Sequence, residues 1–257
     1  DGTLLADALE QNPTAWLGAA HVDRFGVDPM LLVKLLDAGQ RLPVHAHPSG
    51  DFARKHVSTA HGKAEAWYIL LPGVVYLGLL RDVPSAELRS LVAEQDTQRL
   101  LSLMHAIDVQ PGDSVFVPAG VLHAIGEGIL LVEVQEPEDL SILLEWRGFD
   151  LDGDVDGHLG LGFDLALTAV ETRARSLAQI EALIVRGTPD GPILAAGSEA
   201  FFRLDRVSDA EVFPAGLSII IALGSGTLTL AGGEVRALAP GSTTLVAHGC
   251  GEFEVGG

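Results

Sequence analysis

The apolar residues of this chain fall mainly into short runs, and glycine, proline or charged residues separate one run from the next. Runs of this length, bounded by turn-forming residues, are typical of β-strands. The clearest examples are Met30 to Leu36, Val74 to Leu80, Ser114 to Pro118, Ile129 to Val134 and Leu140 to Trp146. Thirty glycines and thirteen prolines indicate many turns, so the pattern predicts a mainly β protein.

Helical spacing occurs in three places. Pro84 has the character of a helix start, and the leucines that follow recur on one face, so we expect a helix that continues through His105. Residues 165–183 also repeat their apolar positions with a helical period. At the N-terminus, Asp1 to Phe25 favours helix and loop, and Pro13 is placed at a helix start.

The acidic, glycine-rich stretch from Asp150 to His158 marks a loop or a domain boundary. On this basis we expect three parts. Residues 1–150 form the first β domain, with a helical insertion at about 84–106. A helical linker follows at 151–183, and a second β domain occupies 184–257.

A short internal repeat connects the two β domains. Residues 111–120 and 240–249 each have the pattern of a glycine turn, a strand and a second turn. Three residues after the first copy stands His123, whereas Glu252 stands at the same place after the second copy. We therefore expect one structural plan used twice, with its histidines kept only in the first copy.

Charge and cysteine content narrow the classes of function. With 35 acidic and 16 basic residues the net charge is −19, which disfavours binding to nucleic-acid phosphates. The single cysteine, Cys250, can form no intramolecular disulfide, and no apolar run is long enough to span a membrane. The N-terminus lacks a basic signal region and also lacks Met, which is consistent with a start further upstream. We therefore expect a cytoplasmic protein without a nucleic-acid or membrane partner.

Four residues have the spacing of a metal site. His45 and His47 are two apart, so on a strand their side chains point to the same face. Either histidine alone would be an ordinary surface or core residue. Glu65 from the next strand and His123 from a distant strand would complete a ligand set suited to zinc, iron, manganese or nickel.

These residues also carry a family resemblance. The segment from Gly39 to His47 matches the first motif of the cupin family through its second histidine, and Gly112 to His123 matches the second cupin motif. In most cupins the glutamate of the first motif follows closely, whereas here residues 48–64 intervene before Glu65. That insertion, which ends in the sequence HGKAEAWYIL at residues 61–70, resembles type I mannose-6-phosphate isomerase (phosphomannose isomerase).

The resemblance implies a tandem cupin, a double-stranded β-helix or jelly roll with helical insertions, whose second copy is degenerate. It implies one divalent metal ion, zinc first among the candidates, held by His45, His47, Glu65 and His123. The implied activity interconverts mannose-6-phosphate and fructose-6-phosphate through a cis-enediol, in a monomer or homodimer. The candidates for the catalytic base are Lys63 and Glu133.

Two positions depart from the family. The first ligand is usually Gln, and this chain has His45. An arginine associated with substrate binding is replaced by Leu143. If a phosphate is bound, Lys63 and Arg147 are the nearest cations in the motif region that could contact it, since an aliphatic side chain cannot.

Several alternatives remain open from the sequence. The protein could isomerise an unphosphorylated sugar, act as an iron-dependent cupin dioxygenase, or be a non-catalytic sugar-binding or regulatory cupin. Lys63 could be a functional cation or a solvated lysine, and Glu133 and Glu136 could orient ligands or face solvent. We expect core packing for Trp67 and Tyr68, and surface positions for the remaining histidines of this half, which are His56, His61 and His105.

Overall fold

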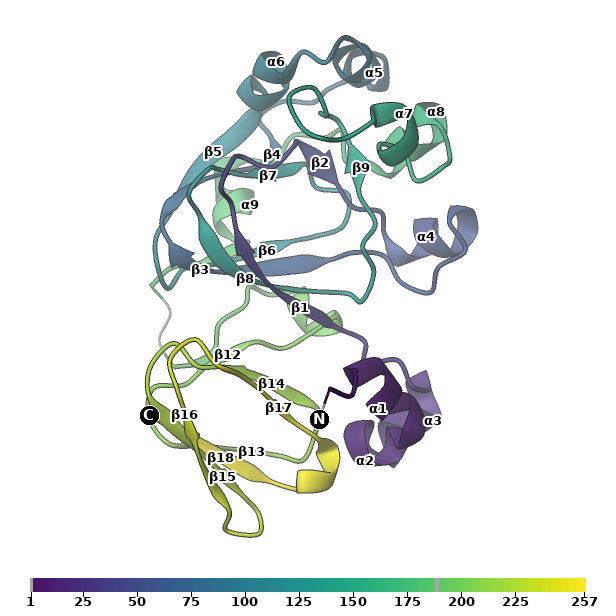
Figure 1. Ribbon diagram of the computed structural model, residues 1–257. Helices are drawn as coiled ribbons and strands as arrows, with labels where there is room; N and C mark the ends of the chain where they lie inside the picture. The colour runs from purple at the N-terminus through teal and green to yellow at the C-terminus, as the bar shows by residue number, and fades with distance from the viewer. Residues whose placement is uncertain (1, 188–189) are drawn as a thin grey trace. The chain divides into compact units, whose positions relative to one another are not determined.

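The computed structural model describes residues 2–187 and 190–257 (Figure 1). Its described residues form two compact units. We call residues 31–187 and 193–204 the histidine unit, and residues 2–30, 190–192 and 205–257 the terminal unit. The N-terminal residues thus belong with the last strands, whereas the domain boundaries expected at 150 and 183 stay a prediction.

The histidine unit contains two five-stranded sheets whose strand pairings are antiparallel. Across the first sheet the order is β1 (Leu32–Asp37), β8 (Leu130–Gln135), β3 (Glu65–Leu71), β6 (Ser114–Val117) and β10 (Ile184–Val185). Across the second it is β5 (Met104–Val109), β4 (Gly73–Leu79), β7 (His123–Ile125), β2 (His45–Ala46) and β9 (Ile142–Leu143). Figure 1 shows the two sheets facing each other.

The core of the histidine unit lies between its sheets. Trp67 and Ile69 of the first sheet and Val75 and Leu77 of the second are fully buried in one apolar cluster. Along β3, Glu65 stands on the same face as Trp67 and Ile69, because alternate residues of a strand share a face. The carboxylate of Glu65 therefore points into the space between the sheets.

The helical insertion is shorter than the sequence predicts. It consists of α5 (Ser85–Glu94) and α6 (Thr97–Ser102). The helix ends at Gln95, whose backbone is left-handed with a φ of 54°, and Asp96 caps the next helix by accepting a hydrogen bond from the Arg99 N–H. The predicted continuation through His105 is wrong, because the chain enters β5 at Met104 and alternates buried with exposed side chains.

The stretch 165–183 is likewise not one helix. It holds the end of α8 (Phe163–Ala166), the 3₁₀ turn η1 (Leu167–Ala169) and α9 (Leu177–Glu181). Between the turn and α9 the backbone bonds to other segments, since the Glu171 N–H donates to Gly120 and the Arg175 N–H donates to Leu79. Two further short helices are α4 (Gly50–His56) and α7 (Gly153–Asp156).

The terminal unit contains three short helices and several β-strands, and the sequence predicts both kinds of element, the helices before Phe25 and the strands after Ile184. The helices are α1 (Leu5–Gln11), α2 (Pro13–Leu17), which has Pro13 at its start, and α3 (Ala19–Phe25). One sheet has the order β13 (Glu211–Phe213), β18 (Phe253–Gly256), β15 (Gly226–Leu230) and β16 (Val235–Leu238). Two strand pairs join β14 (Ser218–Ile221) to β17 (Thr243–Val246) and β11 (Gly191–Pro192) to β12 (Asp205–Arg206).

Both copies of the internal repeat have the expected turn and strand. In the first copy Gly112 adopts a φ of 89° and β6 follows it, and in the second Gly241 adopts a φ of 79° and β17 follows. A positive φ of this size favours glycine, which explains its use at both turns. The predicted mainly β fold is confirmed. Among the described helices, none has the length and apolar content needed to cross a membrane.

Candidate metal centre

Three histidines from the second sheet of the histidine unit meet in its interior. His45 and His123 stand directly opposite each other on β2 and β7, and their ring centroids are 4.1 Å apart. His47 follows β2, and its ring lies 4.9 Å from His45 and 4.8 Å from His123. One ring nitrogen from each histidine lies within 4.8 Å of the other two. The spacing of two between His45 and His47 thus places both rings on one side, as expected.

The outer nitrogen of each histidine is fixed by a backbone carbonyl. Nδ1 lies 2.8 Å from the Pro43 oxygen in His45, 2.7 Å from the Leu140 oxygen in His47 and 2.9 Å from the Val121 oxygen in His123. A carbonyl oxygen only accepts, so each Nδ1 must carry the proton and donate it. In a neutral ring, Nε2 then keeps its lone pair free, which is the arrangement of a metal-binding histidine.

Glu65 faces these nitrogens from the opposite sheet. One carboxylate oxygen, Oε2, is 3.0 Å from His47 Nε2, and the other, Oε1, is 3.3 Å from His123 Nε2. The two Nε2 atoms are buried without a hydrogen-bond partner in the part of the chain that the structure describes, and the buried Oε2 has the Lys63 ammonium at ion-pair distance. Two unpartnered ring nitrogens that face a carboxylate form a set of acceptors that a bound cation would satisfy. Tetrahedral zinc bonds of about 2.0–2.2 Å would separate ligand atoms by about 3.4 Å, so these residues fit a divalent metal.

The electrostatics of the cluster favour the metal-binding protonation states. Burial lowers the pKa of His47 to about 4, although the adjacent Glu65 carboxylate acts in the opposite direction. Burial also lowers the pKa of His45 well below its usual value, and His123 and His47 add to this effect. Burial alone would raise the pKa of Glu65, but His47 and Lys63 outweigh it and hold that pKa well below its usual value. Neutral imidazoles and an ionised carboxylate are the forms that bind metal.

Lys63 stands beside the candidate ligands as a buried cation. Its Nζ is 3.2 Å from Glu65 Oε2 and 3.7 Å from Asp139 Oδ1, and the residue is 4% exposed. Burial lowers the pKa of Lys63, but the negative charges of Glu65 and Glu133 outweigh burial and raise that pKa overall. A solvated lysine is therefore the wrong description, and Lys63 is charged at neutral pH.

Glu133 lies on β8 opposite Trp67 of β3, on the same face as Glu65. The residue is 4% exposed, and burial together with the charge of Glu65 raises its pKa to about 8. Lys34 Nζ lies 3.7 Å from Glu133 Oε2 and 3.1 Å from Asp139 Oδ1. Two lysines and three carboxylates thus form one connected cluster, which we call the lysine–carboxylate cluster.

The sequence analysis missed several members of this site. Trp67 is fully buried, as predicted, but its Nε1 also donates a 3.0 Å hydrogen bond to Glu65 Oε1. Gln135 is paired with Glu65 across the sheet, and its Oε1 is buried without a partner among the described residues. Lys34 and Asp139 were also missed. Trp67 and Gln135 could have been identified from the sequence. Each lies two residues from a glutamate of the site on the same strand, Trp67 after Glu65 and Gln135 after Glu133, so each shares a face with it.

Other candidate residues lie outside the cluster. The exposed Arg147 is held by its backbone N–H, which donates to Gln95 Oε1, and its side chain has no ion pair with any described residue. Leu143 is buried opposite His45 on β9. Glu136 accepts a hydrogen bond from the Ala64 N–H, which fixes the backbone next to Glu65.

The prediction of three surface histidines is wrong for His105. His105 is 8% exposed, and its Nε2 lies 2.7 Å from the Arg175 carbonyl oxygen. It is buried because this part of the chain is strand β5 of the second sheet and not the end of a helix. His56 and His61 are partly buried.

No protein-family model matches the chain, but curated proteins do. It is 35% identical over 146 residues to mannose-6-phosphate isomerase ManA from Bacillus subtilis, covering 55% of this chain and 42% of that protein. It is also 35% identical over 147 residues to mannose-6-phosphate isomerase from Streptococcus mutans, covering 54% and 44%. The chain thus spans less than half the length of these curated relatives.

Solved structures match nearly the whole chain. Mannose-6-phosphate isomerase from Bacillus subtilis superposes with a TM-score of 0.71 at 22% identity, over 96% of this chain and 77% of that one. A variant of phosphomannose isomerase from Salmonella typhimurium gives a TM-score of 0.74 at 16% identity, over 99% and 83%. The resemblance read from the motifs is therefore confirmed: over about half of its length the chain is similar in sequence to mannose-6-phosphate isomerases, and it has the fold of solved phosphomannose isomerases.

Proposed function

We propose that this protein is a metal-dependent aldose–ketose isomerase that interconverts mannose-6-phosphate and fructose-6-phosphate. The observation that carries the proposal is the pair of buried, unpartnered Nε2 atoms on His47 and His123, which face Glu65 and adjoin the lysine–carboxylate cluster. Such a group can bind a cation and, at its edge, move protons. The names of the curated relatives support the same reaction.

The proposed ligands of one divalent ion are His45, His47, Glu65 and His123. Three imidazoles and one carboxylate suit zinc, which makes zinc the first candidate. When bound, such an ion supplies Lewis-acid stabilisation of negative charge on the oxygens of the sugar. The fixed Nδ1 bonds of the histidines and the Trp67 bond to Glu65 keep this ligand set in place before any ion arrives.

The proposed acid–base group is Glu133. Isomerisation moves a proton between C2 and C1 of the sugar through a cis-enediol, so one group must accept a proton and return it. In the metal-free protein the pKa of Glu133 is raised to about 8, and its main cause, burial, persists when a metal binds, so this carboxyl group can both accept and return a proton. Lys63, kept positive by its carboxylate neighbours, is placed to stabilise negative charge that develops on a sugar oxygen.

A phosphate group on the sugar would need a cation to bind it. Leu143 occupies the place next to His45 where the family resemblance leads us to expect arginine. Lys63 is already paired with Glu65, so the exposed Arg147 is the remaining proposed phosphate contact. The buried Leu143 also favours a second candidate function, the isomerisation of an unphosphorylated sugar.

Kinetics with mannose-6-phosphate and free mannose, measured side by side with zinc-loaded and metal-free protein, test the proposal. We expect turnover only in the loaded protein, with the higher kcat/KM for the phosphosugar. Equal or higher kcat/KM for free mannose would replace the phosphosugar by a free sugar. No turnover of either sugar at full metal occupancy would favour a sugar-binding or regulatory role.

A further inference from the structure

A two-residue strand of the histidine unit, β2, carries the candidate ligand His45 and leads directly into His47. β2 contains only His45 and Ala46, so few ladder hydrogen bonds hold it in place. The residues before β2 therefore need other anchors. One is the Leu42 N–H, which donates to the Ile125 carbonyl, and another is the Val44 carbonyl, which accepts from the Leu144 N–H.

A third anchor acts on the histidine itself. The peptide group between Pro43 and Val44 has its carbonyl oxygen 2.8 Å from His45 Nδ1. The N–H of the same peptide donates to Glu145 Oε2 at 2.9 Å. One planar peptide therefore connects the Glu145 carboxylate to the imidazole ring, and its two ends cannot rotate independently.

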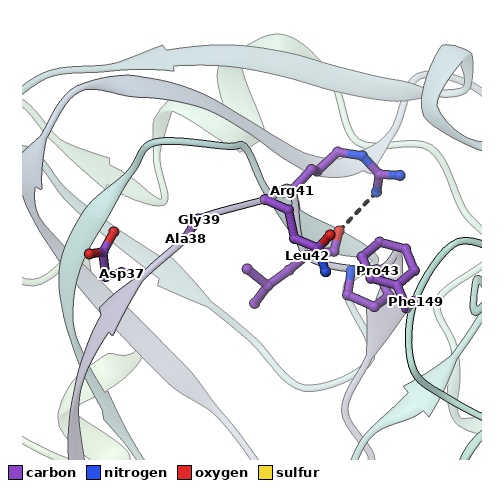
Figure 2. A pocket seen from close by; sticks show the side chains of 8 residues that line it. Asp37, Ala38, Gly39, Arg41, Leu42, Pro43 and Phe149 are labelled. Atoms are coloured by element: carbon purple, nitrogen blue, oxygen red, sulfur yellow. Dashed lines mark hydrogen bonds between the residues drawn. The ribbon is translucent and has the colours of Figure 1, made fainter.

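Glu145 is itself firmly held. It is 2% exposed, and Arg41 binds both of its oxygens, at 2.7 Å from Nη1 and 2.5 Å from Nη2. Arg41 Nη1 also donates to the Leu42 carbonyl oxygen, which Figure 2 shows beside the rings of Pro43 and Phe149. A bidentate arginine fixes the orientation of a buried carboxylate.

We propose that Glu145 is a positioning residue for His45, acting through the Pro43–Val44 peptide to hold the ring with Nδ1 protonated and Nε2 directed into the metal centre. The inference rests on the metal-binding part of the proposed function. A hydrogen bond from the peptide N–H to a charged carboxylate polarises the peptide and strengthens its carbonyl as an acceptor. The stronger bond to Nδ1–H then makes Nε2 a better ligand.

This support is specific to His45. The carbonyls that fix His47 and His123 belong to Leu140 and Val121, and in the described chain no side-chain carboxylate accepts from the peptide N–H that follows either residue. His45 is also the most exposed of the three rings, at 8%. His45 therefore has the least packing of the three histidines. Among them, it is also the one whose carbonyl partner belongs to a peptide that a side-chain carboxylate binds in the described chain.

The test is the metal affinity of Glu145→Gln, measured by competition with a chromophoric zinc chelator in the absence of sugar. Glutamine keeps the size of the side chain but loses the charge, so we expect zinc affinity to fall by about 10-fold, the low end of the range for a ligand's direct partner, because Glu145 acts through the Pro43 carbonyl. The absorption bands of the cobalt(II)-substituted protein should also shift, because they report ligand geometry.

Asp113→Asn is the matched control. Asp113 is a buried carboxylate of the same unit that pairs with Arg186 and accepts the Gln110 and Gly187 N–H groups, but it touches no candidate ligand. We expect it to lower the Tm of the metal-free protein while leaving zinc affinity and the cobalt spectrum unchanged. If Glu145→Gln behaves in the same way, Glu145 has only a structural role and the proposal is overturned.

Arg41→Lys is the second variant, and it decides the matter if Glu145→Gln does not fold. Lysine keeps the positive charge but loses the bidentate contact, so we expect a smaller drop in zinc affinity in the same direction. Unchanged affinity in this variant overturns the proposal. Because every readout is taken without sugar, the inference can fail while isomerase activity is found, and it can hold when no sugar is turned over.

Discussion

The two copies of the internal repeat have the same turn followed by a strand, but they differ in the side chains that they bury. In the histidine unit the turn at Gly112 leads through β6 to His123, which is fully buried. In the terminal unit the turn at Gly241 leads through β17 to Glu252, which is exposed. The same turn-and-strand geometry therefore does not require a polar interior.

The interiors of the two units differ accordingly. All buried polar or charged side chains in the described parts of the chain belong to the histidine unit, whereas the core of the terminal unit is formed by Ala222, Leu228, Leu238, Val246 and Phe253. Buried charges oppose folding unless they are paired. The terminal unit shows that a β unit of this kind does not need buried charges, so we attribute those around the candidate metal centre to chemistry, whereas buried groups such as Gln95 and Asp113 hold the backbone.

The largest effect should come from removing the histidine that distinguishes the copies. His123→Ala takes away one of four proposed ligands, so zinc affinity should fall by more than the about 10–100-fold that loss of an outer partner costs. Competition with a chelator measures it. The matched control is Glu252→Ala at the equivalent place of the second copy, which should bind zinc normally. Equal losses in both variants would contradict the comparison.

A cavity in each core should separate stability from metal binding. Leu228→Ala in the terminal unit and Leu131→Ala in the histidine unit each remove a buried leucine, which typically costs about 2–5 kcal/mol. Urea unfolding measures this loss. We expect only Leu131→Ala to weaken zinc binding as well, because Leu131 is two residues from Glu133 on the same strand face. Weaker zinc binding in Leu228→Ala alone would contradict the placement of the metal centre in the histidine unit.

The pH dependence of the metal-free protein should reflect the same buried groups. Below pH 6.5 the unfolded chain takes up protons on His45 and His47 that the folded chain does not, whereas Glu133 binds its proton in the folded chain up to a pKa of about 8. Between pH 6.5 and 4.5 the two histidines outnumber Glu133, so stability should fall with decreasing pH by about 1.4 kcal/mol per unit.

Between pH 6.5 and 8 only Glu133 contributes among these three. The folded state binds the extra proton, so stability should fall as pH rises, and the maximum should lie near pH 6.5. Urea unfolding at pH 5, 6.5 and 8 measures the profile. Glu133→Gln should remove the alkaline decline. Stability that rises from pH 6.5 to 8 in the metal-free wild type would refute this account of Glu133.

A smaller effect is expected from the proposed phosphate contact. Arg147→Ala should raise KM for the phosphosugar by a factor that shrinks at high salt, because an exposed charge pair is weak and screened. The control is Arg236→Ala, an exposed arginine of the terminal unit. If Arg147→Ala leaves this KM unchanged, the proposed phosphate contact is wrong even if the activity is present.

The smallest effect is expected from restoring the missing histidine. Glu252→His recreates the repeat position of His123 in the terminal unit, but without the companions that His45, His47 and Glu65 provide. Metal content per chain should therefore remain unchanged. A second bound ion would show that the repeat alone suffices to make a site.

Sequence reasoning located the three histidines and Glu65 because their positions follow from short-range rules. His45 and His47 share a face by strand period, and His123 stands at a motif distance from a glycine turn. The helix predicted through His105 was too long because its apolar spacing continues past Gln95. The left-handed backbone that ends the helix there depends on tertiary contacts of the Gln95 side chain with Leu144, Trp146 and the chain around them.

The polar partners of the site were harder to predict. Lys34 meets Glu133 and Asp139 only because β1 pairs with β8, about a hundred residues away. Trp67 was read as core packing, which is correct for its ring and incomplete for its Nε1. No local rule assigns such contacts, since they depend on which strands become neighbours.

The most direct test of the account is an anomalous X-ray difference map, recorded at the zinc edge from crystals of the zinc-loaded protein. The account predicts one peak per chain, bonded to His45, His47, Glu65 and His123, and its loss from crystals of His47→Ala grown under the same conditions. A peak bonded to other residues, or full occupancy in His47→Ala, would contradict it.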